Sequence, residues 1–410
     1  MSNIGKTGVG MSHQQDSELV AERAIEQARN GLSAGSEVGW ALAFCGSKHD
    51  PAVFLSAVRE CLGGVPVYGG ACAGAITNSA LGYGGFECAI ALFDHTLGLP
   101  QAIVVDNLQD GEYDAGKDLG NRLQAQTKDD SAVILLYDSV EASPPPVLHI
   151  GSALLDGIYA GLGARQLHMV GAGTIIDLQL TASYLFDGSN VVKHTAVALA
   201  LPEGISAETR IMHGCSPVSS FFEITRIEGP EVFELDGRPA IDVIREISGG
   251  EPNIANGDMS LIVTLGRKYG DLYSDFSEGD YVNRLVIATN PDNGSIILFE
   301  SDYEPGAKVQ VMSVDTEVML ESVSTGSTDL LRSLQGKTPL FASYFNCGGR
   351  ASPFSGTSEE DAAIVQRTLT DQIPLLGCYT GVEIGPLLGR SRPLDWTGVL
   401  TVFTLDMATV

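Results

Sequence analysis

A short apolar strand that runs into a glycine turn occurs three times in this chain. The copies are VPVYGGACAG at 65–74, LHMVGAGT at 167–174 and IPLLGCYT at 373–380. Aligned, they share a glycine and, three positions later, a small side chain with a polar terminal group: Gly69 and Cys72, Gly171 and Thr174, and Gly377 and Thr380. A period of about a hundred residues is too long for a solenoid unit and indicates duplicated α/β modules that pack into larger sheets.

Each copy lies in the same predicted order of elements, which is a strand, a helix, the glycine-turn strand and a return strand. First and return strands are predicted at 38–45 and 86–93, at 132–137 and 191–201, and at 339–344 and 397–405. The helices between them open at Asp50-Pro51, run from Leu154 to Leu162, and open at a capping box of Thr357 and Glu360. A further helix before the first strand is predicted to begin at a capping box of Ser12 and Gln15.

The stretch from Glu223 to Phe299 has a different, β-rich pattern. It contains a strand and tight turn at 233–240, a short helix that ends at Gly249, and strands at 261–265, 285–289 and 295–299. A Pro/Gly break at 201–204 precedes it. At 410 residues two domains are the default. We therefore predict an α/β fold of repeated strand-helix-strand-strand units, with mixed sheets flanked by helices, in two domains: 1–208 with two units, and 209–410 with the β-rich segment and the third unit.

The net charge excludes several classes of partner. Lys plus Arg number 24 against 51 Asp plus Glu, which gives −27. Nucleic acid and anionic membrane surfaces both require a basic face, so neither is expected. No apolar run reaches the roughly 18 residues that a membrane span needs. The seven scattered cysteines are typical of a reduced compartment, and we expect a cytoplasmic protein.

Two motifs near the C-terminus resemble a known family. Asn-Cys-Gly-Gly-Arg at 346–350, followed by GCYTGVEIGP at 377–386, resembles the Cys-x-x-Arg and Gly-x-x-x-x-Gly-Glu-Ile pair of the C-terminal FIST domain. Residues 233–240 resemble the opening of that domain, and the Gly69-Gly70 and Gly171 turns resemble the two halves of the N-terminal FIST domain. The sequence departs from the family at Val382, where the family often has Gly directly or one residue before the Glu-Ile pair. The resemblance covers nearly the whole chain and implies an N-terminal FIST domain over 1–208 and a C-terminal one over 209–410.

The resemblance implies a sensor in a bacterial signal-transduction pathway. Such domains sense a small molecule and pass the state to a histidine kinase, a cyclic-dinucleotide enzyme or a chemotaxis receptor. No such output domain is predicted here, so the chain is expected to act as a stand-alone sensor, for example in a two-component system, by altering a partner protein. A narrower alternative, also implied by the resemblance, is a haem b protein that senses nitric oxide and regulates a histidine kinase.

The glycine turns are candidate ligand cradles, because turns at the ends of parallel strands are where α/β sheets usually bind ligands. The competing explanation is that glycine serves tight strand packing or a positive-φ bend. No turn continues into Gly-Lys-Ser/Thr, which excludes a nucleotide P-loop. The predicted ligand-binding residues are Gly69, Gly70, Cys72, Cys347, Arg350, Gly377, Tyr379, Thr380 and Glu383.

Arg350 and Glu383 are the charged members of this set. Arg can bind a carboxylate through two hydrogen bonds while Glu accepts from an ammonium group, so the pair suits an amino-acid-like ligand. In the alternative interpretation, Arg350 and Glu383 pair with each other and hold the two turns together.

Cys347 precedes two glycines, where backbone N–H groups can activate a thiolate, and a Cys347-dependent enzyme is a second alternative. No His lies near it in sequence, and a small buried Cys is a common core residue. Without a complete acid, base and nucleophile set, we expect no enzyme. The seven His form no metal-binding motif, so no metal site is predicted. The haem alternative requires one axial ligand, for which His194 and His213 are the candidates.

Overall fold

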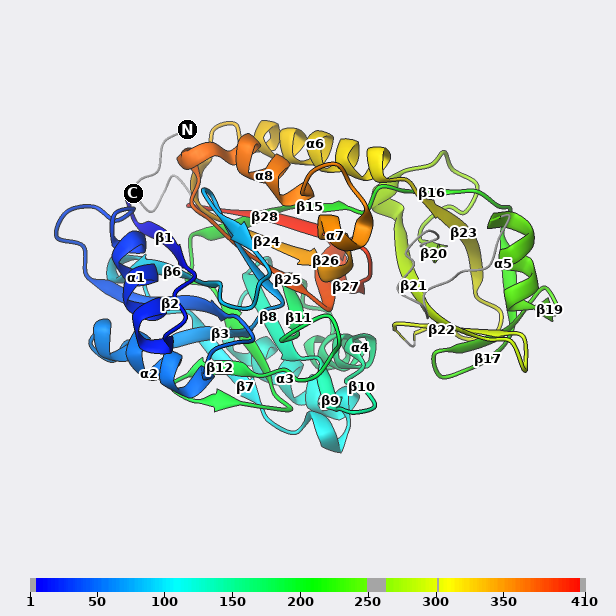
Figure 1. Cartoon of the computed structure of the whole chain (residues 1–410), viewed down its shortest axis with the longest axis horizontal. Helices are drawn as coiled ribbons and strands as arrows, with labels where there is room; N and C mark the ends of the chain where they lie inside the picture. Colours follow the sequence, from blue (N-terminus) through cyan, green and yellow to red (C-terminus); the bar gives the residue numbers. More distant parts are fainter. Residues whose placement is uncertain (1–4, 249–262, 301, 406–410) are drawn as a thin grey trace.

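Three units of the same connectivity form the larger part of the computed structural model, which describes residues 5–248, 263–300 and 302–405 (Figure 1). The first unit comprises β1 (Thr7–Ser12), α1 (Ser17–Arg29), β2 (Val38–Cys45), α2 (Pro51–Cys61), β3 (Val67–Ala71), β4 (Gly74–Thr77), β5 (Leu81–Gly82) and β6 (Cys88–Asp94). The second comprises β7 (Gln101–Val105), α3 (Glu112–Gln126), β8 (Ala132–Asp138), β9 (Val140–Ala142), β10 (Val147–Leu148), α4 (Gly151–Leu162), β11 (His168–Thr174), β12 (Leu185–Gly188), β13 (Val191–Val192) and β14 (Ala196–Ala200). The third comprises β15 (Ile205–Met212), α6 (Thr316–Ser333), β24 (Thr338–Cys347), α7 (Ser352–Ser355), α8 (Asp361–Leu369), β25 (Leu375–Thr380), β26 (Val382–Leu387), β27 (Arg390–Leu394) and β28 (Gly398–Leu405).

The units exchange hairpins in a cycle. Over the described residues, each unit contributes four strands to a six-stranded sheet, and another unit adds the last two. The sheet orders are β1-β6-β2-β3-β12-β13, β7-β14-β8-β11-β26-β27 and β15-β28-β24-β25-β4-β5. Each glycine turn is therefore the point at which the chain leaves its own sheet and enters the sheet of another unit.

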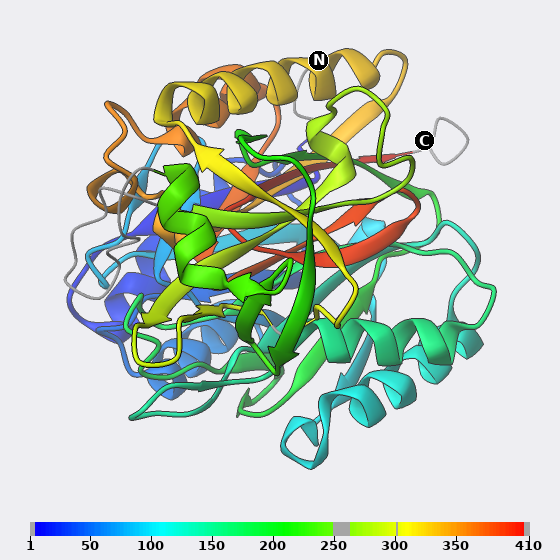
Figure 2. The same cartoon turned by 90° about the vertical axis from the view of Figure 1, so that its right-hand side faces the viewer.

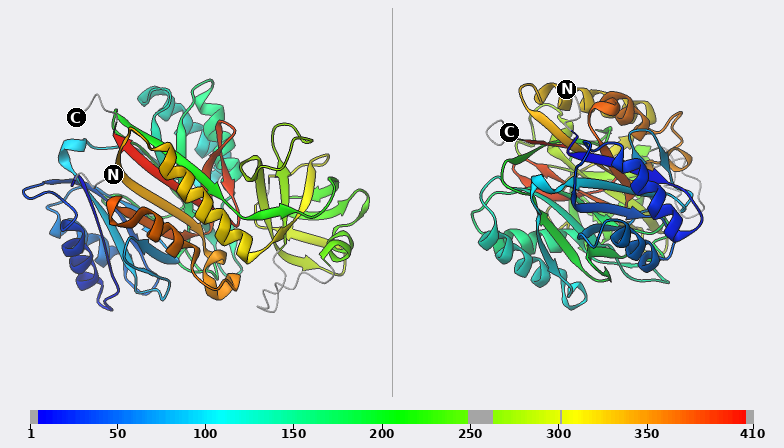
Figure 3. Two further views of the ribbon diagram at one scale, coloured as in Figure 1. Left: turned by 90° about the horizontal axis from the view of Figure 1, so that it is seen from above. Right: turned by 90° about the vertical axis from the view of Figure 1, so that its left-hand side faces the viewer.

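The helices cover the outside of this assembly in pairs. α1 packs on α2, α3 on α4, and α6 on α8. The right-hand view of Figure 3 shows the three pairs set around the strands. The inner faces of all three sheets share one apolar cluster, which includes Phe44, Leu136 and Phe345. We call residues 5–212 and 316–405 the body.

The segment between β15 and α6, residues 213–315, forms a separate β-rich part that we call the insertion. It comprises β16 (Cys215–Pro217), β17 (Phe222–Glu228), β18 (Glu231–Leu235), β19 (Arg238–Pro239), α5 (Ala240–Ser248), β20 (Val263–Lys268), β21 (Tyr281–Asn290), β22 (Ser295–Leu298) and β23 (Lys308–Val314). These strands form one sheet with its own apolar cluster beneath α5. It projects from one end of the body in Figure 1 and faces the viewer in Figure 2.

The predicted α/β class, with mixed sheets flanked by helices, is confirmed, and several elements need correction. α1 begins at Ser17 because the Asp16 carboxylate accepts the N–H groups of Glu18 and Leu19, so the predicted Ser12 cap is wrong. The predicted 191–201 strand is two strands, since His194 interrupts it with φ 50°.

The third unit and the insertion also differ in detail from the prediction. The predicted capping box of Thr357 and Glu360 is wrong: Glu360 itself is the N-cap of α8, and no side chain bonds the N–H groups of the first turn. The first two residues of the predicted 261–265 strand lie outside the described residues, as does Gly249, the predicted end of the short helix. Within the described ranges, no helix combines the length and the apolar character needed to cross a membrane.

Candidate functional site

The three repeated glycines lie at equivalent positions in parallel strand pairs. Gly69 faces Ala43 across β3 and β2, Gly171 faces Leu135 across β11 and β8, and Gly377 faces Tyr344 across β25 and β24. At each one, an added Cβ would overlap the carbonyl oxygen of the facing residue. Tight strand packing therefore accounts for glycine at all three positions without a ligand.

A cavity of about 340 Å³ lies where the insertion meets the body. From the insertion it is lined by Leu285 and Ile287, on β21, and by Phe299, the residue after β22. Leu178, in the segment after β11, and Phe354, in α7, line it from the body. We call this space the interface cavity. A largely apolar pocket with a few polar groups is the usual form of a small-molecule site.

The polar end of the interface cavity is formed by Cys347, Thr380 and Asp395. Cys347 ends β24, Thr380 ends the neighbouring parallel strand β25, and the two residues are register partners. The Thr380 hydroxyl donates to Oε1 of Glu383 at 2.8 Å. The structure thus brings together Cys347, Thr380 and Glu383 of the predicted ligand-binding set.

Burial controls the protonation of this polar end. It raises the pKa of Asp395 to about 7, against the attraction of Arg284. Burial, and then the negative charge of Glu383, raise the pKa of the Cys347 thiol. The pKa of Glu383 is also raised well above its usual range, first by burial and then by Asp395. Cys347 is therefore a neutral thiol near pH 7, whereas a thiolate nucleophile requires a lowered pKa.

Arg350 has a different partner from the one predicted. Its guanidinium is fully buried; Nε donates to Oδ2 of Asp361 at 2.9 Å, and Nη2 lies 2.8 Å from the same oxygen. It also donates to the carbonyl oxygens of His213 and Trp396, both at 3.2 Å. The predicted Arg350–Glu383 pair is therefore wrong, since the guanidinium meets Asp361, the first residue of α8. Arg350 does not line the interface cavity.

Three other predicted residues lie elsewhere. Tyr379 lines a neighbouring recess of about 330 Å³, which shares Leu178 and Phe354 with the interface cavity, and it donates to Glu360 at 2.8 Å. Gly70 lies against the backbone of β12, and Cys72 is a buried thiol whose pKa burial raises.

The two candidate haem ligands do not fit a haem site. His213 is fully buried, its Nε2 donates to the Glu278 carbonyl at 3.0 Å, and its Nδ1 accepts from the Cys215 N–H at 2.9 Å. His194 shares a 3.2 Å hydrogen bond with His149. In the part of the chain that the structure describes, no His lines the interface cavity and no group of three or more metal-ligating side chains occurs.

Buried polar contacts fix the insertion to the body on both sides of the interface cavity. Arg284 on β21 donates to Asp302 twice at 2.6 Å and to the Pro393 carbonyl at 3.1 Å, and it lies 3.5 Å from Asp395. Glu300, just after β22, accepts from the N–H groups of Gly151 and Ser152, at 2.9 and 3.1 Å. It thereby caps the first turn of α4 in the body, which satisfies N–H groups that lack a partner in the helix.

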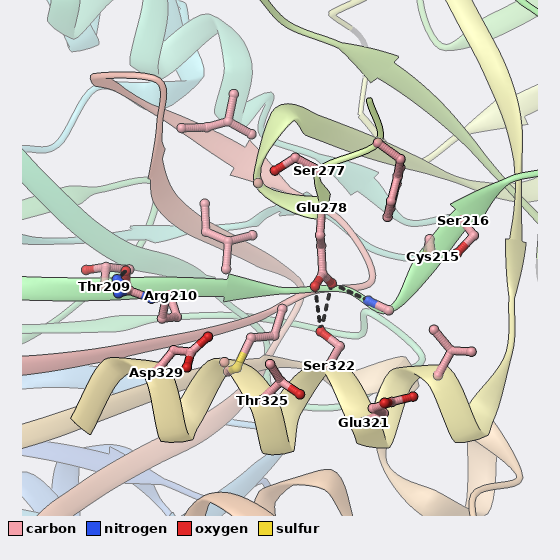
Figure 4. Close-up of a pocket in the computed structure, with 18 of the residues that line it drawn as sticks. Thr209, Arg210, Cys215, Ser216, Ser277, Glu278, Glu321, Ser322, Thr325 and Asp329 are labelled. Atoms are coloured by element: carbon pink, nitrogen blue, oxygen red, sulfur yellow. Dashed lines mark hydrogen bonds between the residues drawn. The ribbon is translucent and has the colours of Figure 1, made fainter. Parts of the chain in front are cut away.

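A third contact lies where the chain passes between the two parts (Figure 4). A groove of about 580 Å³ separates α6 and β15 from the loop around Ser277. Glu278 reaches across it, accepting from the N–H groups of His213 and Gly214 and, at 2.8 Å, from the hydroxyl of Ser322 on α6. Glu278 therefore ties the insertion to the body at the connecting peptide.

Sequence reasoning did not find Asp395, Asp361 or Arg284. Asp395 and Arg284 carry no motif, and the contact between them joins residues more than a hundred positions apart. Asp361 stood one residue after the predicted capping Glu360, which is the local signal that could have marked it.

The fold and the cavity define a two-part α/β protein with a largely apolar cavity at the junction of its parts. The chain belongs to the FIST family: the FIST N domain matches residues 39–238, and the FIST C domain matches residues 240–386. FIST domains are generally sensor domains of signal transduction that bind small ligands.

Comparison with known proteins gives sequence relatives and a distant match to a solved structure. An uncharacterized protein of Mycobacterium bovis is 28% identical over 227 residues, which cover 54% of this chain and 57% of that protein. One of Mycobacterium tuberculosis is 27% identical over 223 residues, covering 53% and 56%. The chain thus spans a little over half the length of these relatives. A cyanuric acid hydrolase from A. caulinodans aligns over 98% of this chain and 99% of its own, with 10% identity and a TM-score of 0.35, which is too low to establish a common fold.

Proposed function

We propose that this protein is a small-molecule sensor in which a ligand in the interface cavity alters how the insertion sits against the body. The observation that carries this proposal is the composite wall of the cavity. Ile287 and Phe299 come from the insertion, whereas Cys347 and Thr380 come from the body. A ligand that touches both parts shifts their arrangement if it binds one arrangement more tightly than another.

The proposed readout is a surface that a partner signalling protein binds. For a FIST protein the partner is expected to be a histidine kinase or a cyclic-dinucleotide enzyme. The proposed site of action is the cytoplasm, in keeping with seven cysteines that form no disulfide. We propose binding and not catalysis, because the polar end combines a neutral thiol and buried carboxyl groups without a lining His. Since Arg350 is paired with Asp361, recognition of an amino-acid carboxylate by Arg350 is not part of this proposal.

Thermal melting in the presence of a metabolite library tests the proposal. Compounds that bind the folded protein raise its melting temperature. Ile287→Trp places a ring in the interface cavity and is expected to abolish the stabilisation by such compounds. Ile297→Trp, on the adjacent strand β22, introduces the same side chain away from the cavity and should leave the stabilisation intact. Compounds that stabilise both variants equally would place the binding site elsewhere.

A further inference from the structure

The polar end of the interface cavity offers mainly hydrogen-bond acceptors. The Thr380 hydroxyl uses its proton on Glu383, so its oxygen remains as an acceptor. The Gly381 N–H is already donated to the Gly173 carbonyl, at 3.1 Å. Among the described residues, no Lys, Arg or His side chain lines the cavity. Gln179 also lines the cavity and its amide group can donate, but this side chain is exposed. A ligand that meets the buried polar end must therefore bring donors of its own.

Asp395 is the strongest of these acceptors. Its side chain is 2% exposed and lines the cavity, and Oδ2 accepts the Leu285 N–H at 3.0 Å. Oδ1 accepts no hydrogen bond. The nearest cation to Oδ1 is Arg284, at 3.5 Å, whose guanidinium already forms two 2.6 Å bonds to Asp302. A buried acceptor without a donor costs free energy, which a bound donor would recover.

Positive charge is scarce around this end of the cavity. The carboxyl groups of Asp395, Glu300 and Asp302 share the guanidinium of Arg284, and Arg350, which attracts Glu383, is paired with Asp361. Burial, followed by the attraction of Arg284 and the repulsion of Glu300, leaves the pKa of Asp395 at about 7. A cation bound here would stabilise the ionised form of these carboxyl groups.

We infer that the interface cavity binds an apolar amine, whose aliphatic or aromatic body lies against Leu178, Ile287 and Phe299 and whose ammonium group donates to Oδ1 of Asp395. This inference rests on the proposed function, since it names the class of ligand for the same cavity. An α-amino acid is a poorer fit, because its carboxylate would approach Asp395 without meeting a lining cation.

Isothermal titration calorimetry with three probes of one shape tests the ligand class. The probes are 2-phenylethylamine, 2-phenylethanol and phenylalanine, which share a phenyl ring and differ in their polar groups. A charge-assisted hydrogen bond predicts that the wild-type protein binds the amine about 10-fold to 100-fold more tightly than the alcohol, with phenylalanine weakest. Equal binding of amine and alcohol, or tighter binding of phenylalanine, would overturn the inference while leaving a ligand site in the cavity. Failure of all three probes to bind would overturn the inference, and the library melting experiment would then decide the proposed function separately.

Variants assign the preference to Asp395. Asp395→Asn retains an oxygen for the Leu285 N–H and is expected to remove the preference for the amine over the alcohol. Asp271→Asn, which changes an exposed carboxylate in the insertion, should bind all three probes as the wild type does. An unchanged preference in Asp395→Asn would show that another group receives the amine and would overturn the assignment. Circular dichroism of each variant establishes that it is folded before titration.

Discussion

Arg350 and Asp361 form an ion pair with neither side chain exposed to solvent. Asp361 also accepts from Asn346 at 2.7 Å and from Tyr344 at 3.2 Å, so its charge is stabilised by three side chains. Because a buried charge without its partner is costly, the pair is more important for folding than a surface salt bridge would be. Through Asp361 the network holds the start of α8 against β24.

Removing one partner of this pair is expected to destabilise the fold strongly. Arg350→Met leaves the Asp361 carboxylate buried without a cation and should lower the free energy of unfolding by about 3–5 kcal/mol. In Arg350→Met/Asp361→Asn the uncompensated charge is gone, so the double variant should be more stable than the sum of the single changes predicts, by about 0.5–3 kcal/mol. Urea unfolding of the four proteins gives the coupling. Strict additivity would contradict a coupled buried pair.

Asp395 predicts a pH dependence of stability. Its pKa is about 7 in the folded protein, raised from 3.8 chiefly by burial, so the folded state holds this proton more tightly than the unfolded state does. The contribution of Asp395 is therefore most favourable below pH 4 and is lost as the pH rises through 7. Asp395→Asn does not titrate, and its unfolding free energy relative to wild type should rise by about 2–4 kcal/mol between pH 4 and 8. Urea unfolding at several pH values measures the difference, and a flat difference would mean that Asp395 is ionised throughout.

At the scale of the elements, the parallel strand pairs determine where glycine is required. Gly171 lies opposite Leu135, where an added methyl group would overlap the Leu135 carbonyl oxygen, and β11 is held between β8 and β26. A strand confined on both edges cannot move aside without loss of ladder hydrogen bonds.

Gly171→Ala is therefore expected to destabilise the protein by about 3 kcal/mol or more. Gly279 provides the matched control, because an added Cβ there meets no atom within 4 Å. Gly279→Ala should change stability by no more than about 0.5 kcal/mol. Urea unfolding compares the two variants, and a small effect at Gly171 would show that the sheet can relax around a methyl group.

The same elements show what could be predicted from sequence and what could not. Apolar runs and glycine turns predicted the inner strands, with 38–45 matching β2 in full. The helices α3 and α6 were missed for local reasons. α3 carries Gly116 and Gly120, which read as helix breaks but allow its backbone to pack closely on α4, and α6 is rich in Ser and Thr, which have low helix propensity. In the site, Cys347 and Thr380 were found beside glycine motifs, whereas Asp395 reaches the cavity only because β26 and β27 cross into another unit's sheet.

At the scale of the whole molecule, the contacts of Arg284, Glu300 and Glu278 hold the insertion on the body together with apolar contacts, and the three polar contacts differ in exposure. The Arg284 and Glu300 contacts are buried beside the interface cavity, whereas the Glu278 side chain is 27% exposed at the connecting peptide. Gly214, with φ 66°, lies against the backbone of Met319 in α6, so this connection is closely packed as well. A ligand that shifts the insertion must act against the Glu278 contact.

Glu278→Ala should loosen the junction without unfolding either part. The N–H groups of His213 and Gly214 and the Ser322 hydroxyl would lose their common acceptor, while the contacts of Arg284 and Glu300 remain. Amide hydrogen exchange at 213–216 and at the start of α6 is expected to become about 10-fold faster, since each lost hydrogen bond to a charged group is worth about 1.5–3 kcal/mol. Glu321→Ala removes an exposed carboxylate that lines the same groove and should leave exchange unchanged. Equal exchange in the two variants would show that Glu278 does not restrain the insertion and that the other contacts between the two parts determine its position.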